Sequence, residues 1–354
     1  MGAAGSFAVA DRLRELAASF ACASEAAGGV AVDEYIVGAG RVSLRFAGPT
    51  LRERLTPAFA HLAAKPGERR GPASLTVHLW DSASGGTEPP RRPPGRGDGP
   101  SGALYEFHEP PLRGVYQPGL ETLSVLDTET GVAWHWVADA SERPSWDQAC
   151  PIRQILSWWL RSRGQLQVHA AAVGTAGAGV LVVGPPGSGK STVALSCLGS
   201  ELLYAGDDYV AVTLEPSPLV ASLYNSGKLD PPHLRSRFPH LLPLLANEDR
   251  LESEKAILYV ERHFPEQTTR GFPIAAVLVT TVRAERRDPE IVPASLAGAF
   301  AALAPTTMFQ LHTAGAEELS TLSSLIARVP CFALELGSDL RALPGKISDF
   351  LSTL

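Results

Sequence analysis

The sequence predicts an α/β core preceded by a smaller α+β domain. From Leu166 onward the chain alternates strand, glycine-rich turn, helix and strand, as layered α/β folds do. Before that point, short strand patterns follow one amphipathic helix pattern. The length of 354 residues is sufficient for two domains, each with its own core. We expect the first domain over residues 1–148 and the second over residues 149–354.

Composition and charge exclude several classes of protein. Apolar residues make up 45% of the chain and charged residues 19%, which is typical of a globular protein. A net charge of −6 provides no broad basic field, so neither nucleic acid nor a membrane surface is an expected partner. No apolar run approaches the ~18 residues of a membrane span. Because Asp11 and Arg12 interrupt the N-terminal apolar pattern, that segment is not a secretory signal, and we expect a cytoplasmic protein.

The four cysteines show no spacing that suggests a metal site or a disulfide framework. We expect them to be small buried side chains in a reducing compartment. They are Cys22, Cys150, Cys197 and Cys331.

In the first domain, apolar residues repeat at helical spacing over residues 9–27 and again over residues 51–64. Short alternating runs predict strands at residues 30–37, 41–46, 75–80, 103–107, 114–116, 122–127 and 132–136. The first two runs flank Gly38-Ala39-Gly40 and predict a hairpin. The segment 81–102 is rich in Ser, Gly, Pro and Arg and cannot form a core, so we expect an exposed flexible loop.

In the second domain, a helix pattern over residues 151–163 precedes the α/β alternation. Apolar runs predict strands at residues 168–173, 179–183, 201–205, 256–260, 274–281 and 331–335. Helical patterns cover residues 191–198, 295–304, 316–327 and 338–351.

A glycine-rich loop follows the buried strand pattern at 179–183 and matches GxxxxGK[ST] in full. In such a loop the glycines let backbone N–H groups converge on phosphate oxygens, with the N-terminal end of the next helix behind them. The lysine reaches the β- and γ-phosphates, and the serine hydroxyl ligates Mg²⁺. We therefore expect ATP and Mg²⁺ at Gly184, Pro185, Pro186, Gly187, Ser188, Gly189, Lys190, Ser191 and Thr192.

The acid expected after a later apolar strand in switch GTPases and mechanical ATPases is missing, because the run at 274–281 ends in Thr280-Thr281. Asp207-Asp208 follows a short strand pattern instead, soon after the loop helix. His169 lies just before the strand that leads into the loop. Strand, loop, helix, strand and acidic pair form a compact unit that can bring both carboxylates and the histidine to the phosphates.

The stretch from His169 to Val210, with Val-His, Gly-Pro-Pro-Gly-Ser-Gly-Lys-Ser and Ala-Gly-Asp-Asp, resembles the HPr kinase/phosphorylase family. That family has a P-loop kinase core related to phosphoenolpyruvate carboxykinase. The resemblance implies that Asp207 is the base for the substrate hydroxyl, with His169 as its partner. It further implies that Asp208 and Ser191 hold Mg²⁺ and that Lys190 acts on the phosphates. A homo-oligomer is compatible with the resemblance, since HPr kinases are hexamers.

Downstream segments at 223–229, 254–258, 271–274 and 305–308 resemble a subgroup encoded with ribosomal peptide clusters, which includes lasso-peptide precursor kinases. The Glu-Ile-Arg-Gly segment of the true HPr enzymes is missing, so the resemblance favours a peptide with an acceptor serine over HPr. Lys228, Lys255 and Arg270 are further candidates for acceptor or phosphate contacts. The expected activity is γ-phosphoryl transfer to a serine hydroxyl. The alternatives are a nucleotide-binding regulatory or assembly protein and a small-molecule hydroxyl kinase.

Overall fold

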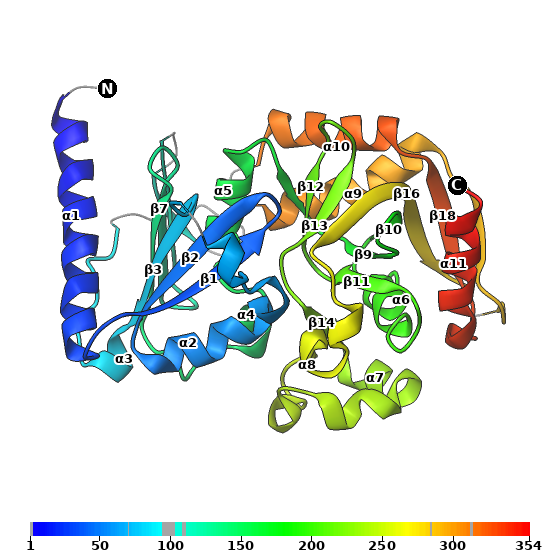
Figure 1. The fold of residues 1–354 in the computed structure, drawn as a ribbon, viewed down its shortest axis with the longest axis horizontal. Coiled ribbons are helices and arrows are strands. Elements are labelled where there is room, and N and C mark those ends of the chain that lie inside the picture. The colour runs from blue at the N-terminus through cyan, green and yellow to red at the C-terminus, as the bar shows by residue number, and fades with distance from the viewer. Residues whose placement is uncertain (1–2, 70, 94–102, 108–110, 284, 312–313) are drawn as a thin grey trace. The chain divides into compact units, whose positions relative to one another are not determined.

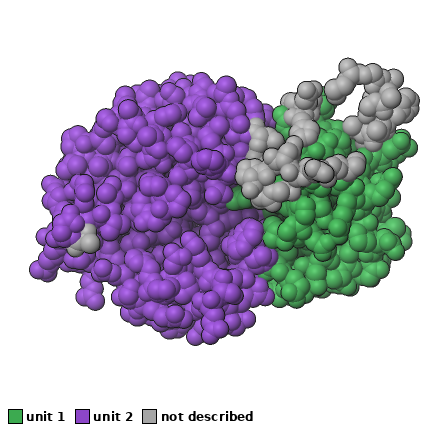
Figure 2. All heavy atoms as spheres, turned by 180° about the vertical axis from the view of Figure 1, so that it is seen from behind, with its two compact units in different colours: residues 1–57, 63–143, 152–159 green, residues 58–62, 144–151, 160–354 purple. Residues whose placement is uncertain are grey.

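The computed structural model describes residues 3–69, 71–93, 103–107, 111–283, 285–311 and 314–354 (Figure 1). Contacts divide the chain into two compact units, coloured separately in Figure 2. Unit 1 comprises residues 1–57, 63–143 and 152–159, and unit 2 comprises residues 58–62, 144–151 and 160–354. The chain therefore crosses between the units several times rather than at one boundary.

Unit 1 is built on a mixed sheet whose seven described strands lie in the order β1-β2-β3-β7-β6-β5-β4. The strands are β1 (Ala31–Val37), β2 (Gly40–Ala47), β3 (Leu75–Asp81), β4 (Leu104–Phe107), β5 (Leu112–Gln117), β6 (Thr122–Asp127) and β7 (Val132–Val137). The predicted hairpin is confirmed, since β1 pairs antiparallel with β2 and Val37 lies opposite Gly40. Strand β3 pairs in parallel with β2 and with β7.

Helix α1 (Ala3–Ala26) packs along β2 and β3 in Figure 1. Its residues Leu16, Phe20 and Ala23 recur at spacings of four and three, which places them on one helix face. They share a core with Trp80 of β3 and Trp136 of β7, both fully buried. The amphipathic pattern thus predicted the face that α1 buries.

The stretch that was expected to be one helix over residues 51–64 is instead α2 (Pro49–Leu55) followed by the 3₁₀ helix η1 (Thr56–Leu62). Pro57 explains the change, because it has no N–H to continue an α-helical ladder. The 3₁₀ helix η2 (Pro66–Glu68) follows. The predicted loop 81–102 begins with the end of β3 and the one-turn helix α3 (Ser82–Gly85), and its residues 94–102 lie outside the described residues.

Two short helices follow β7 in the chain: α4 (Ser145–Ala149), which belongs to unit 2, and α5 (Arg153–Arg161), most of which belongs to unit 1. The expected single helix over residues 151–163 is shorter at both ends, and α4 was not predicted.

Unit 2 contains a larger mixed sheet with a main path of β11-β9-β10-β16-β13-β12-β8 among the described strands. Its strands are β8 (Leu166–Val168), β9 (Ala171–Gly174), β10 (Gly179–Val183), β11 (Leu203–Gly206), β12 (Val210–Thr213), β13 (Leu219–Ser222), β16 (Gly271–Val282), β17 (Glu290–Pro293) and β18 (Cys331–Leu336). Strand β16 pairs in parallel with β10 and with β18. A separate hairpin pairs β14 (Ser226–Leu229) with β15 (Ala256–Tyr259). The mixed α/β architecture predicted from the sequence is confirmed.

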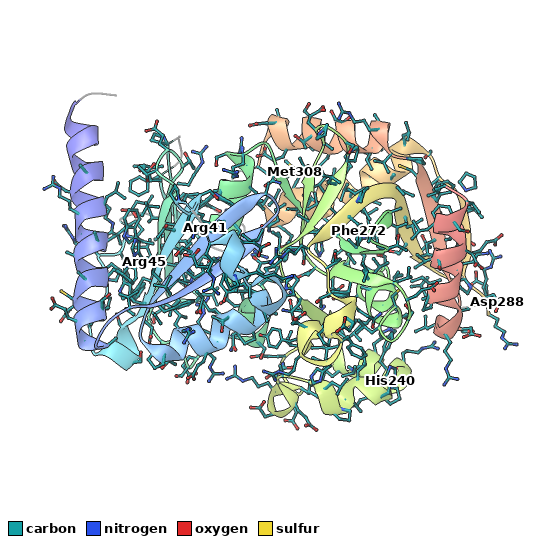
Figure 3. All side chains as sticks on the ribbon, viewed as in Figure 1. Arg41, Arg45, His240, Phe272, Asp288 and Met308 are labelled. Carbon is teal, nitrogen blue, oxygen red and sulfur yellow. The ribbon has the colours of Figure 1, made fainter. Side chains whose placement is uncertain are left out.

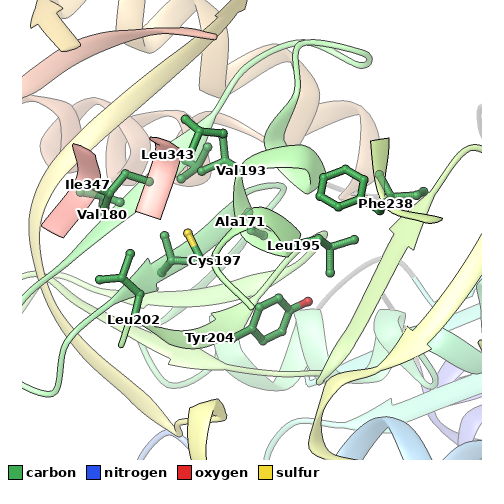
Figure 4. Packing of buried hydrophobic residues seen from close by; sticks show 14 of the residues in the cluster. Ala171, Val180, Val193, Leu195, Cys197, Leu202, Tyr204, Phe238, Leu343 and Ile347 are labelled. Atoms are coloured by element: carbon green, nitrogen blue, oxygen red, sulfur yellow. The ribbon is translucent and has the colours of Figure 1, made fainter. Parts of the chain in front are cut away.

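Helices pack on both faces of this sheet (Figure 1). Val180 and Val182 of β10 belong to a core with α6 (Lys190–Ser196) and α11 (Leu343–Ser352), part of which Figure 4 shows. Leu181 and Val183 belong to a second core with α9 (Leu296–Gln310) and α10 (Ala316–Arg328). Because alternate side chains of β10 enter different cores, the strand must be apolar throughout, as its sequence is.

The remaining described elements of unit 2 are short. They are α7 (Pro231–Arg237), α8 (Val260–His263), η3 (Pro239–Leu244), η4 (Glu248–Arg250), η5 (Pro265–Gln267) and η6 (Leu340–Ala342). Among the described residues, none of the helices combines the length and apolarity needed to cross a membrane. All four cysteines are free thiols; Cys22 is exposed, against expectation, and the other three are buried.

Candidate functional site

The glycine-rich loop joins β10 to α6, where the sequence predicted it. Gly184 has φ 154° and Gly189 has φ 103°, a region that favours glycine. Side chains at these positions would also collide with neighbours: a Cβ on Gly184 would lie 2.4 Å from Ser188 Oγ, and one on Gly189 would lie 2.2 Å from Leu336 Cδ1. Both glycines are therefore required by the conformation of the loop.

Thr280, at the end of β16, supports the loop from the neighbouring strand. Its hydroxyl lies 2.7 Å from the Ser188 hydroxyl and donates to the carbonyl oxygen of Val183 at 3.1 Å. Parallel pairing of β16 with β10 places Thr280 beside the start of the loop. The position that lacks an acid in the sequence is thus occupied by a buried threonine that holds the loop in place.

The Lys190 side chain folds back over the loop. Its ammonium donates to the carbonyl oxygens of Gly184 at 2.8 Å and Pro185 at 3.3 Å. Burial lowers the pKa of Lys190, and the carboxylates of Asp207 and Asp208 oppose that shift. The charge of Lys190 therefore lies within electrostatic range of the acidic pair.

The two hydroxyl residues after Lys190 point to different partners. The Ser191 hydroxyl lies near Asp207 and lowers the pKa of that carboxyl, whereas the Thr192 hydroxyl lies 3.0 Å from His233 Nε2. The Thr192 side chain contacts α7 through His233, and its place in the nucleotide site stays a prediction. Helix α6 has only 7 residues, so the loop amides and Lys190, rather than a long helix dipole, are the groups available to phosphates.

Interrupted strand pairing places the acidic pair. Strand β9 pairs with β11 up to Ala172 and Gly206, and β8 pairs with β12 from Val168 and Val210. Residues 169–171 and 207–209 lie between these two ladders on adjacent antiparallel segments. The predicted continuous strand over residues 168–173 is therefore broken at His169-Ala170, and His169 faces the segment that carries the acidic pair.

His169 contacts Asp208, whereas the resemblance implied a pairing with Asp207. His169 Nε2 lies 2.9 Å from Asp208 Oδ1. The backbone N–H of His169 donates to Thr307 Oγ1 at 3.2 Å, on the part of α9 next to Met308, which Figure 3 labels. The His169 ring also lies 5.6 Å from the Tyr209 ring.

Lys228, on β14, contacts both members of the acidic pair. Its ammonium forms an ion pair with the Asp208 carboxylate, and its backbone N–H donates to Asp207 Oδ2 at 2.9 Å. Burial alone would raise the pKa of Asp208, but the charges of Lys228 and His169 outweigh it and hold that pKa well below its usual range. Burial likewise opposes the charge of Lys228, and Asp208 outweighs it and raises the pKa of Lys228.

Asp207 is held differently from Asp208. Asp207 is 2% exposed as a residue, and its Oδ1 has no hydrogen-bond partner among the described residues. Burial first, and the negative charge of Asp208 second, raise the pKa of Asp207 to about 6. The Lys228 N–H and the Ser191 hydroxyl only partly offset this. A buried carboxylate with an unpartnered oxygen is an unfavourable group that a cation would stabilise.

The other two candidate cations lie in different surroundings. Lys255 forms an exposed ion pair with Asp230 at 3.5 Å, and its charge also lowers the pKa of Lys190. Arg270 lies near His61, where its charge adds to the larger effect of burial in lowering the pKa of His61. The structure thus brings Lys228 and, at longer range, Lys255 to the predicted phosphate site.

Sequence reasoning missed several residues around the acidic pair. Cys150 Sγ lies 3.5 Å from the Lys228 ammonium, and the Tyr209 ring centroid lies 5.9 Å from it. Tyr209 directly follows the pair in sequence and could have been suspected on that ground. Cys150, Thr280 and Thr307 reach the site only through tertiary packing, and the sequence carries no signal for them.

The site suits Mg²⁺ bound together with a nucleotide rather than a metal enclosed by protein. No cluster of three or more His, Cys, Asp or Glu side chains among the residues described could hold a metal. Mg²⁺ commonly uses one or two protein oxygens together with phosphates and water. Ser191 Oγ and the unpartnered Asp207 Oδ1 are oxygens of this kind, and the Ser191 hydroxyl is near enough to lower the pKa of Asp207.

No protein-family model matches this sequence, and no curated protein matches it. Among solved structures, the Hpr(Ser) kinase/phosphatase from Coxiella burnetii is similar to this chain with 12% sequence identity and a TM-score of 0.30. The match covers 53% of this chain and 94% of that chain. A similarity of this size carries no argument about activity.

Proposed function

We propose that this chain is a phosphotransferase that binds ATP and Mg²⁺ at the loop 184–192 and transfers the γ-phosphoryl group to a hydroxyl. One observation carries the proposal: the loop lysine, the loop serine and an acidic pair share one site. The Ser191 hydroxyl is near enough to lower the pKa of Asp207, the charges of Asp207 and Asp208 raise the pKa of Lys190, and Lys228 contacts both carboxylates. Phosphoryl transfer needs positioned cations at the phosphates and a carboxylate that orients the attacking hydroxyl, and these are the groups present.

A role in transfer, beyond nucleotide binding alone, is supported by the second half of the site. Holding a nucleotide and Mg²⁺ requires the loop, Ser191 and one carboxylate. Asp208, His169 and Lys228 form an additional charged group next to it. Such a buried charged group adds little to stability, because an apolar replacement of the same size is often as stable or more stable. We therefore infer that it has a functional task.

The acceptor that we propose is the serine hydroxyl of a peptide, including a ribosomal precursor peptide of the lasso type. The downstream sequence resemblance and the edge strands of the unit 1 sheet support it. Strand β1 is the outermost described strand on its side of that sheet. Its outer edge is bonded to residues 63–64 at Glu34 and Tyr35, and an extended peptide can add through main-chain hydrogen bonds to the part before them, where Val32 is 45% exposed.

The first test concerns the nucleotide and uses calorimetric titration of the full chain. Lys190→Ala should weaken ATP binding by more than tenfold and AMP binding by much less, because the ammonium serves the β- and γ-phosphates. The matched control is Lys346→Ala, which removes an exposed lysine on α11 and should change neither affinity. Equal, unchanged affinities of Lys190→Ala for ATP and AMP would exclude the loop as the triphosphate site.

The second test concerns the acceptor and uses mass spectrometry. The full chain, ATP, Mg²⁺ and a serine-ending precursor peptide from the same gene neighbourhood should produce a singly phosphorylated peptide. Val32→Lys should raise KM for the peptide without changing ATP affinity. A truncation starting near residue 146 would be a poor test, because residues 58–62 belong to unit 2. Faster phosphorylation of small alcohols than of the peptide would favour the small-molecule alternative.

A further inference from the structure

One row of side chains crosses the sheet of unit 1 on the face against which α1 packs. Val32 of β1 pairs with Arg45 of β2. Arg45 pairs with His78 of β3, and His78 pairs with Trp134 of β7, so the four side chains point to the same face. The Phe20 ring of α1 lies 4.6 Å from the His78 ring. Val32 is exposed and the other three are half-buried, so the row is partly open to solvent beside α1.

Two arginines of β2 point to this face, and they differ in their partners; Figure 3 labels both. Arg41 forms an ion pair with Glu34 and donates to the carbonyl oxygens of Arg69 and Gly71. The Arg45 side chain has no hydrogen bond or ion pair with any described residue, and its Nε is buried without a partner. A buried donor of this kind is unfavourable until an acceptor completes it.

The surroundings of Arg45 leave its charge uncompensated. Both acids of the adjacent strand β1, Asp33 and Glu34, already pair with other arginines. Burial first, and the charge of Arg45 second, lower the pKa of His78 to about 4, so this histidine is neutral at neutral pH. Its Nδ1 is also buried without a partner among the described residues. The row therefore carries one positive charge and two nitrogens that lack partners.

These features fit a peptide carboxylate. An arginine binds a carboxylate through two parallel hydrogen bonds, and one positive charge matches one negative charge better than it matches a doubly charged phosphate. The Trp134 ring, 6.1 Å from the His78 ring and inclined to it by 24°, provides an apolar surface beside the charge. A peptide strand added outside β1 at Val32 would lie two strand spacings from β2, roughly 10 Å, which two long side chains can span.

We propose that Arg45 binds a carboxylate of the acceptor peptide, on a surface formed with His78 and Trp134. The inference rests on the proposed function, because it takes a peptide as the acceptor. It makes Arg45 a specificity-determining residue. An acidic side chain and the C-terminus of the peptide both supply this chemistry. The row belongs entirely to unit 1, so binding there can be measured without nucleotide.

The experiment retains random hexapeptides on the full chain in the absence of nucleotide. One library has free C-termini and contains Asp and Glu; the other has amidated C-termini and neither acid. The wild type should retain the first library about tenfold better or more, and Arg45→Gln should abolish that preference. Arg14→Gln, the control, removes an exposed arginine that pairs with Asp11 and should keep the preference. A third library, amidated but containing both acids, distinguishes acidic side chains from the C-terminus.

Calorimetry with the best-retained peptide then gives the size of the effect. Arg45→Gln should weaken binding by about tenfold or more, as expected for the loss of a hydrogen bond to a charged group. Arg45→Lys should recover part of the affinity, since it keeps the charge but not the paired donors. Circular dichroism verifies that both variants are folded, and ATP affinity should stay within about twofold of the wild type.

Equal retention of the first two libraries by the wild type, including retention of neither, would overturn the inference. An unchanged peptide affinity in Arg45→Gln would overturn it as well. Failure of the proposed function looks different: the chain would then bind carboxylate peptides through Arg45 but transfer no phosphate to them from ATP.

Discussion

His135 in unit 1 and His169 in unit 2 are both largely buried, with exposed fractions of 5% and 11%, but they face charges of opposite sign. His135 Nδ1 lies 3.0 Å from the Ser124 hydroxyl, and burial first and the positive charge of Arg143 second lower its pKa to about 3. His169 Nε2 lies against the Asp208 carboxylate. A neutral histidine between strands completes a core, whereas a histidine against a carboxylate can orient it for chemistry. The residue type alone therefore does not indicate which histidine is functional; its neighbours do.

The largest expected effect concerns the neutral histidine. A histidine whose pKa is lowered on folding leaves stability intact above its unfolded value of 6.5, and stability is lost as pH falls toward about 3. At about 1.36 kcal/mol per pKa unit, the difference between the two pKa values limits the contribution of His135 to the unfolding free energy to about 5 kcal/mol. His135→Gln should therefore flatten the fall in unfolding free energy below pH 6.5, measured by urea titration. Measurement at pH 8 gives the packing cost of the substitution alone. An unchanged acid slope would mean that His135 is not held neutral.

The cluster of His169, Asp208 and Lys228 should be more sensitive to loss of a single partner than the surroundings of His135 are. Lys228→Met leaves Asp208 without its cation, and breaking a buried ion pair typically costs 3–5 kcal/mol, so we expect a loss of roughly that size. Lys255→Met, which removes an exposed lysine from a 3.5 Å pair, should cost less than about 1 kcal/mol. Adding Asp208→Asn to Lys228→Met should restore part of the loss. Similar costs for the two lysine variants in urea titrations would refute a buried pair.

Asp207 should make the nucleotide-free protein less stable near neutral pH. A carboxyl whose pKa rises on folding, here from 3.8 to about 6, costs stability as pH rises through that interval. At about 1.36 kcal/mol per pKa unit, the ionised Asp207 lowers the unfolding free energy by at most about 3 kcal/mol. Asp207→Asn should therefore be more stable than the wild type at pH 8, with the gain disappearing near pH 4. Thermal unfolding at both pH values measures this difference, and a variant less stable than the wild type at pH 8 would contradict it.

The smallest effect concerns the support of the loop. Thr280→Val removes the hydroxyl that contacts Ser188 and the Val183 carbonyl, so we expect a loss of ~1–3 kcal/mol with nearly unchanged packing. ATP affinity should fall by a few-fold, since the loop is less well ordered. Thr281→Val changes the exposed neighbour on β16 in the same way and should affect neither quantity. An unaltered ATP affinity in Thr280→Val would show that the loop does not depend on this contact.

Features that depend on local structure could be predicted from the sequence. The β1–β2 hairpin follows from a glycine turn between two alternating runs, and β10 follows from a continuous apolar run that enters two cores. The loop after β10 could be placed to the residue, because only glycine fits the backbone at Gly184 and Gly189. His169, Asp207 and Asp208 could be expected near this loop from the short segments that connect them.

Tertiary structure alone decided which of these residues touch. The gap between the β9–β11 and β8–β12 ladders brings His169 to Asp208. The register of these strands cannot be predicted from a single sequence, because both faces of the strands are apolar. Lys228 arrives from a separate hairpin, and its ion pair with Asp208 depends on how that hairpin packs. The contact of the Thr192 hydroxyl with His233 likewise depends on how α7 packs against α6, and the sequence does not predict it. The sequence identifies the candidate residues, but packing between segments far apart in the chain determines which of their side chains are in contact.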